Sequence, residues 1–432
     1  MQSSKRRFTY TPLTNEKHGT RLFLTCFIVY LLFVATRNFW PQAMAQLVPG
    51  GVFTKDVAGM ASSAHMLAYG VGMFLNGFIS EKVQPFFYIA ASLGISAGAN
   101  AVAFAISQAQ TPNIVPYVVI WAIAGFFQSA TWPTMIRTVS TLMPEARRAS
   151  SGANLFAASV TGEICSYLIS QQVLRMASWR ALFLTSAAVG FFIFAFWLFM
   201  TAPVSKLCCA RIEACAEVPE AAKISRTKSA APHSMLKLLI VSGGFTIIFS
   251  IAFKSLAYDG FKGWIATMIS ELFGLDAGFS VMLSTLVPIC NLLGVFIGRL
   301  IFNKLTHSEV LSSAIYMTLG SVGLALIAVI GLKSITALLV ILFVTIPIIA
   351  ASSTMYISLV PLRFARFGRS GTAAGLFNSI ACAGSGTSSL MIGILSQNFG
   401  WQTTVFVLAA LMLLGGICSM VTIRRFNKFK EM

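Results

Sequence analysis

The stretch that decides the fold is "LLFVATRNFWPQAM", residues 31–44, in which a charged side chain, Arg37, interrupts an otherwise apolar run. The apolar residues 22–35 and the following residues 36–48 together can cross a hydrocarbon layer of about 30 Å, because a helix rises about 1.5 Å per residue. A guanidinium inside a bilayer is costly, so such a group marks either a functional site or an ion pair. The stretch therefore predicts a membrane helix whose single cation has a function or a partner.

The composition extends this prediction to the whole chain. Of its 432 residues, 56% are hydrophobic and only 10% are charged, and the mean hydropathy is +0.80. These values lie outside the range of ordinary soluble domains. Because backbone groups in lipid must pair within their own segment, we expect helices. Twelve spans are predicted, at residues 21–47, 56–80, 85–107, 113–141, 148–174, 179–202, 235–272, 277–302, 309–332, 335–362, 369–397 and 401–423.

The net charge of +18 is explained by the membrane and needs no nucleic acid. Residues 1–21 have neither the apolar core nor the cleavage site of a signal peptide, so the first span is expected to direct insertion. If both termini are cytoplasmic, the basic residues gather on that side, as in a bacterial-type inner-membrane protein. Those residues are Arg6, Arg7, Lys17, Arg21, Lys82, Arg147, Arg148, Lys206, Arg211, Lys304, Arg363, Arg366, Arg369, Arg424 and Arg425.

The sequence lacks the motifs of enzymes, of nucleotide-binding proteins and of metal sites. It contains no cluster of catalytic groups and no nucleotide-binding glycine loop, so we predict no enzyme, no cofactor and no direct coupling to ATP. The cysteine cluster at Cys208, Cys209 and Cys215 lacks a histidine at ligand spacing. We therefore expect reduced thiols there and no metal site.

The chain divides near its middle at a polar stretch. We predict an N-terminal bundle at residues 1–202, a cytoplasmic loop at 203–233 and a C-terminal bundle at 234–432. The two halves are similar: "SGANLFAAS" precedes "SWRALFLTSAA" in the first, and "GTAAGLFNS" precedes "GWQTTVFVLAA" in the second. Such parallel repeats enclose a substrate site between two bundles at mid-depth. The predicted fold is an all-α polytopic membrane protein with twelve helices in two pseudo-symmetric six-helix bundles, the architecture of the major facilitator superfamily.

Motifs in both halves resemble the organophosphate:phosphate antiporter family of that superfamily, which includes glycerol-3-phosphate and hexose-6-phosphate transporters. The motifs are "YLLFVATRNFWPQAM", "AYGVGMFLNGFISEK", "GFFQSATWPTMIRTVS", "SWRALF", "GWIATMISELFGLD" and "GTAAGLFN". The resemblance implies that Arg37 holds a substrate phosphate together with an arginine of the seventh span. A guanidinium offers phosphate or carboxylate a planar fork of donors. Two other arrangements stay open, in which Arg37 reaches the membrane interface or pairs permanently with a buried acid.

The seventh span departs from the family pattern. Counting back from Trp264, the second arginine is replaced by Tyr258, while Lys254 and Lys262 lie about one turn to either side. Either lysine could place an ammonium near Arg37, and either could instead extend to the interface.

Two more basic positions of the family are lost, since its second-helix lysine becomes Met73 and its fifth-helix histidine becomes Ala158. The resemblance therefore supports the fold and an anionic substrate better than a sugar phosphate. A carboxylate such as a hexuronate, as carried by a related family of anion:cation symporters, stays open.

Helical spacing adds further candidates for the cavity wall. Tyr30 shares a face with Arg37, and His65 shares one with Tyr69. His65 and Glu163 are candidates for proton coupling, because imidazole titrates near neutral pH and an acid within the membrane marks function or pairing. Alternatively, His65 is a neutral group bonded to a neighbouring helix and Glu163 belongs to a structural ion pair. The predicted substrate-binding residues are Arg37, Tyr30, Tyr69, His65, Gln128, Lys254, Tyr258 and Asn378.

The loop "GFISEKVQP" resembles the superfamily's Gly-x-x-x-Asp-Arg gating motif only in part, with Glu81 in the acidic position and Lys82 in the basic position. We predict a monomeric secondary active transporter that moves a small organic anion across the bilayer by alternating access, with inorganic phosphate or a proton as coupling ion. The alternative is a membrane sensor with the transporter fold, like a hexose-phosphate receptor. A long adapted loop would favour that sensor, and the loop predicted here is short.

Overall fold

The computed structural model describes residues 8–10, 16–80, 83–109, 113–143, 145–211, 235–367 and 369–431. The predicted gating pair, Glu81 and Lys82, lies outside these residues, as does Cys215.

The first half folds into long helices that follow the predicted spans. They are α1 (Glu16–Thr36), α2 (Trp40–Leu47), α3 (Lys55–Ser80), α4 (Pro85–Ser107), α5 (Ile114–Gln128), α6 (Thr131–Leu142), α7 (Glu145–Met176) and α8 (Trp179–Cys208). Helix α8 continues six residues beyond its predicted end at 202, past Pro203. The strand β2 (Cys209–Arg211) follows α8 directly. It pairs antiparallel with β1 (Phe8–Tyr10), which precedes α1. The all-α expectation thus misses one short pairing, because three-residue strands leave no periodic signal in a sequence.

The second half has more interruptions. Its helices are α9 (Met235–Ser242), α10 (Gly244–Lys254), the π-helix η2 (Ser255–Asp259), the 3-10 turn η3 (Phe261–Gly263), α11 (Ile265–Phe273), α12 (Ala277–Ser284), α13 (Leu286–Ile301), η4 (Phe302–Thr306), α14 (Glu309–Val329), η5 (Gly331–Lys333), α15 (Ile335–Ser353), η6 (Thr354–Leu359), α16 (Val360–Arg363), η7 (Ala365–Phe367) and α17 (Ser370–Glu431). Two predicted spans merge in α17, which has non-helical backbone angles at Gly400, where φ is +75°.

Among the described residues, eight helices are long and apolar enough to cross a membrane, or nine if the bent pair of Met235–Ser242 and Gly244–Gly263 counts as one span. The number twelve therefore stays a prediction. Helices α3 and α7 are not among the eight, and both carry polar side chains such as Asn76 and Glu163. Both also pack against the opposite bundle, α3 against α17 and α7 against α12. Their polarity is consistent with facing the protein interior rather than lipid.

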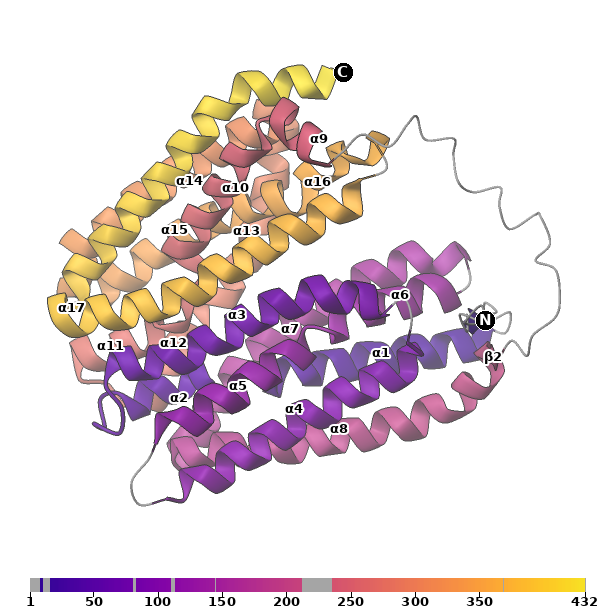
Figure 1. The fold of residues 1–432 in the computed structure, drawn as a ribbon. Coiled ribbons are helices and arrows are strands. Elements are labelled where there is room, and N and C mark those ends of the chain that lie inside the picture. Colours follow the sequence, from indigo (N-terminus) through magenta and orange to yellow (C-terminus); the bar gives the residue numbers. More distant parts are fainter. Residues whose placement is uncertain are drawn as a thin grey trace.

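Helices α1–α8 form one bundle and α9–α17 the other, and the two lie closest where α3 runs beside α17 (Figure 1). Glycines allow this approach, because a Cβ at Gly393 would lie 2.5 Å from the Lys55 carbonyl oxygen and one at Gly59 would lie 2.8 Å from that of Ser389. Nearer the chain termini this close packing ends among the described residues, since none of their atoms would lie within 4 Å of a Cβ at Gly77 or Gly375. The bundles are closed at the end away from the termini and separated at the other end.

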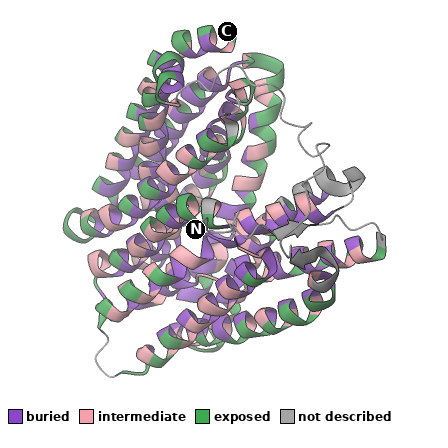
Figure 2. Ribbon diagram, turned by 45° about the vertical axis from the view of Figure 1, so that its right-hand side comes forward, coloured by how far each residue is buried: buried purple, intermediate pink, exposed green. Residues whose placement is uncertain are grey.

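The outer faces of both bundles carry the exposed residues (Figure 2). Many of these are large and apolar, with Phe87 and Phe192 both more than 60% exposed. In water such surfaces would mark interaction sites, and in a bilayer they face lipid tails. The protein is thus an integral membrane protein.

Candidate functional site

Arg37 lies at a break between α1 and α2. Pro41 has no N–H group, so it cannot bond to the carbonyl four residues earlier, which is that of Arg37. The Gln128 amide nitrogen of α5 donates to this carbonyl oxygen over 2.9 Å. The Thr36 carbonyl oxygen accepts from the Ser186 hydroxyl of α8. Side chains from two other helices therefore satisfy the broken backbone and fix the position of Arg37.

The Arg37 guanidinium is directed into the protein. Its Nη1 lies 3.4 Å from the Tyr69 hydroxyl, and its central carbon lies 5.4 Å from the centre of the Tyr69 ring and 5.9 Å from that of Phe33. Among the described residues, no carboxylate lies within 4 Å of it. The Arg37 side chain therefore has aromatic neighbours and one weak hydrogen bond, so most of its donor fork is not engaged by the described residues.

Gln128 and His65 lie behind Arg37 in a buried hydrogen-bonded network. The Gln128 Nε2 donates to the Arg37 carbonyl oxygen and, over 2.8 Å, to the Ser96 hydroxyl. This fixes the amide orientation, so the Gln128 Oε1 must accept from His65 Nε2, 2.9 Å away. The other ring nitrogen of His65 lies 3.5 Å from the Asn38 amide nitrogen, which is a donor. Both contacts fit the neutral imidazole, and both residues are buried, with Gln128 0% and His65 4% exposed.

The π-helix η2 determines which lysine of the seventh span is available. A π-helical turn brings residues five apart onto one face, and Lys254 Nζ accordingly lies 2.7 Å from Asp259 Oδ2. The Lys254 side chain is only 3% exposed. Tyr258, also predicted to contact substrate, donates its hydroxyl to Asn291 Oδ1 over 2.7 Å. The charge of Lys254 is therefore already balanced by Asp259.

Lys262 is the second basic residue of the seventh span. It lies half-buried in η3, within electrostatic range of Arg37, Glu163 and Asp259. No carboxylate within 4 Å pairs with it among the residues that the structure describes. The sequence analysis placed Lys254, and not Lys262, among the substrate-binding residues. The sequence signal was Asp259, five residues after Lys254 and able to neutralise it.

Glu163 completes the group of charges. It follows Gly162, where a Cβ would lie 2.5 Å from the Leu31 carbonyl oxygen, so α7 packs tightly on α1 at this level. Glu163 is within electrostatic range of both Arg37 and Lys262. The group, which we call the charge cluster, consists of three basic and two acidic side chains and has one net positive charge. Its members are Arg37, Lys254, Lys262, Glu163 and Asp259.

The two remaining predicted residues lie near this charge cluster. Tyr30 is buried, with its ring 5.2 Å from that of Trp132, and is within electrostatic range of Arg37. Asn378 lies half-buried on α17, one turn before Cys382, which packs against Gly70 of α3. Both therefore lie close to the interface between the bundles.

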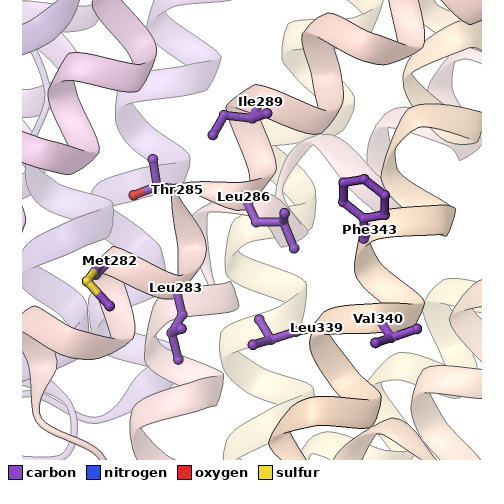
Figure 3. Close-up of a pocket in the computed structure, with 8 residues that line it drawn as sticks. All are labelled: Met282, Leu283, Thr285, Leu286, Ile289, Leu339, Val340 and Phe343. Atoms are coloured by element: carbon purple, nitrogen blue, oxygen red, sulfur yellow. The ribbon is translucent and has the colours of Figure 1, made fainter.

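A separate groove between α12, α13 and α15 has a different character (Figure 3). Its lining includes no charged side chain, so it offers nothing to hold an anion. The lining residues are Met282, Leu283, Thr285, Leu286, Ile289, Leu339, Val340 and Phe343. Among the described residues, no three histidine, cysteine or acidic side chains lie close enough together to bind a metal. The charge cluster is therefore the candidate site.

A family model described as "Major Facilitator Superfamily" matches residues 22–389. The chain belongs to the Major Facilitator Superfamily. This membership confirms the predicted fold class and makes the protein a transporter-family member rather than an enzyme. Among solved structures, a bacterial homologue of the human lysosomal transporter Spinster has a TM-score of 0.78 at 11% identity, covering 96% of this chain and 99% of that one. The nucleoside transporter NupG has a TM-score of 0.67 at 14% identity, over 94% of this chain and 98% of that one. These two likenesses concern the fold alone.

Curated relatives of this superfamily member are of the organophosphate type, which confirms the resemblance drawn from the motifs. A probable hexose phosphate transport protein of Chlamydia trachomatis is 30% identical over 28% of this chain and 25% of its own length. The glycerol-3-phosphate transporter of Bacillus subtilis is 25% identical over 40% and 39%. The membrane sensor protein UhpC of Salmonella typhimurium is 22% identical over 39% of each chain. The matches thus span about a quarter to two fifths of these relatives.

Proposed function

We propose that this protein is a secondary active transporter of a small organic anion, which binds between Arg37 of the first bundle and Lys262 of the second. The observation that carries the proposal is that these two cations come from opposite bundles and lie within electrostatic range of each other. Neither has a carboxylate within 4 Å among the described residues. Two like charges held together in a membrane interior are costly, and an anion placed between them removes that cost.

The arrangement supports alternating access. An anion that contacts both bundles favours their approach around it, so binding energy is available to change the conformation. At the closed end the bundles are joined by a latch, which consists of Lys55, Glu271 and Trp401. Lys55 Nζ of α3 lies 3.0 Å from Glu271 Oε2 of α11, and Trp401 Nε1 of α17 donates to the same oxygen over 2.7 Å. Opening this end requires the latch to break.

We further propose the predicted orientation, with both termini in the cytoplasm of a bacterial inner membrane and the protein working as a monomer. Under that orientation the separated end of the bundles faces the cytoplasm. The basic residues at helix ends on the side of the termini support this choice.

The substrate class that fits is an organophosphate or a carboxylate. The names of the relatives, a hexose phosphate transport protein and a glycerol-3-phosphate transporter, support the organophosphate. The fork of Arg37 suits either class, and Lys262 adds a point charge without a preferred geometry.

Uptake into proteoliposomes tests the proposal. We expect wild type to accumulate at least one of three labelled anions, glycerol 3-phosphate, glucose 6-phosphate and glucuronate, when tested with a pH gradient or with internal phosphate. R37Q and K262Q should each reduce uptake at least tenfold, whereas K333Q, which removes an exposed lysine of η5, should match wild type. Unchanged uptake in R37Q would refute the proposal, and saturable binding without translocation in wild type would favour the sensor instead.

A further inference from the structure

Carboxylates are rare in the middle of this membrane protein. Of thirteen acidic residues in the sequence, only Glu163 and Asp259 fall in the central part of a predicted span. Asp259 is held by Lys254 at 2.7 Å. Glu163 has no basic nitrogen within 4 Å among the residues that the structure describes. Because an ionised carboxylate without a close partner is costly in this setting, Glu163 calls for an explanation.

The surroundings of Glu163 place it among the groups that would bind the anion. The preceding residue, Gly162, packs against Leu31 and Val34 of α1, and Glu163 is within electrostatic range of Arg37 and Lys262. It is also within electrostatic range of Tyr258 of η2 and Tyr167 of its own helix. The two cations are therefore shared between Glu163 and any bound anion. An ionised Glu163 competes with that anion, whereas a protonated Glu163 carries no charge and leaves both cations free for it.

We propose that Glu163 carries the proton that moves together with the anion. A proton passes from water onto a carboxylate oxygen of Glu163, the anion binds Arg37 and Lys262, and both leave on the opposite side of the membrane. His65 is a weaker candidate, because its two hydrogen bonds are those of the neutral ring and it is buried behind Arg37. This proposal rests on the proposed anion transport and adds its coupling ion, a proton, with symport rather than exchange as the mode.

Thermodynamic linkage gives the direction of the pH effect. If protonation favours anion binding, then anion binding favours protonation by the same factor. The apparent affinity for the anion therefore rises as pH falls. For one coupled proton the change in KM approaches about tenfold per pH unit in the range where Glu163 is mostly ionised.

The test uses reconstituted full-length protein and whichever of glycerol 3-phosphate, glucose 6-phosphate and glucuronate wild type accumulates. We expect wild type to accumulate the anion when a pH gradient is imposed, and its KM to fall as pH is lowered. E163Q should lose this accumulation and the pH dependence of KM, whereas exchange of labelled for unlabelled anion should fall far less than accumulation does. A purely structural role would reduce exchange and accumulation by the same factor, so the contrast between the two assays identifies coupling.

The outcomes separate the two proposals. Accumulation driven by a pH gradient in E163Q, or pH-independent transport by wild type, would overturn the role of Glu163 and leave anion transport standing. If wild type moves none of the three anions, the proposed function fails and the coupling proposal fails with it. Should E163Q not reconstitute, E163D decides: a shifted pH profile with coupling kept supports the proposal, and a profile identical to wild type contradicts it.

Discussion

Replacing Glu271 by glutamine tests the latch that closes the bundles away from the termini. E271Q keeps a side-chain oxygen for Trp401 Nε1 but removes the charge that pairs with Lys55, whose Nζ also lies 5.4 Å from the centre of the Trp401 ring. When the bundles separate at this end, water can replace those contacts. The substitution therefore weakens the present conformation relative to the opposite one.

The size of the shift follows from the geometry of the pair. A hydrogen bond between charged groups contributes about 1.5–3 kcal/mol. The Lys55 and Glu271 side chains are 14% and 21% exposed, so solvent screening lowers this to about 1–2 kcal/mol. Since 1.4 kcal/mol is a factor of ten, we expect the conformational equilibrium to move by about 5- to 30-fold.

Electron paramagnetic resonance distances measure this equilibrium directly. Spin labels attached through a noncanonical amino acid at Ile79 of α3 and Thr372 of α17 sit on exposed positions at the separated end, and they avoid the native cysteines. E271Q should increase the population with the shorter distance, while K333Q should leave it unchanged. If the ratio of the short-distance to the long-distance population in E271Q stays within a factor of two of the wild-type ratio, the role of the latch is refuted.

Two further predictions concern residues around the charge cluster. Q128L leaves the Arg37 carbonyl oxygen and His65 Nε2 without their partner, so we expect KM for the transported anion to rise about tenfold with a smaller change in kcat; equal effects on both would contradict a positioning role. K254Q leaves Asp259 unpaired and should lower the unfolding free energy by about 3–5 kcal/mol, whereas the K254Q/D259N double variant should recover most of the loss in a thermal unfolding assay. A double variant as unstable as K254Q would contradict this account of the buried pair.

The fold could be predicted from the sequence because a bilayer imposes a strong constraint. Long apolar segments had to be helices, and the described helices lie along the predicted spans, with different ends. The structure also differs by breaking the span at 235–272 into several helices and by joining the last two spans in α17. Shorter-range features were missed. Helix α8 continues through Pro203 to Cys208, and β1 pairs with β2, because neither depends on hydropathy. Twelve spans were predicted from the apolar segments of the sequence, and eight or nine are identified among the described residues.

The site was harder to predict, because counting along a regular helix fails where the helix is irregular. The π-helix η2 brings Lys254 and Asp259 together, whereas Lys262 has no carboxylate within 4 Å among the described residues. Sequence periodicity also cannot separate a side chain on the cavity surface from one in the layer behind it. Gln128 was predicted to contact substrate, and in the structure it bonds to the Arg37 carbonyl oxygen that Pro41 leaves unpaired. Arg37 itself was predicted from the sequence, because a charged residue in an apolar run stands out.

A structure determined with the transported anion tests the central claim most directly. We predict the anion at mid-depth between the bundles, within hydrogen-bonding distance of both the Arg37 guanidinium and the Lys262 ammonium, with Lys254 still bound to Asp259. An anion bound without contact to Arg37, or an Arg37 side chain turned toward the lipid headgroups, would contradict the account.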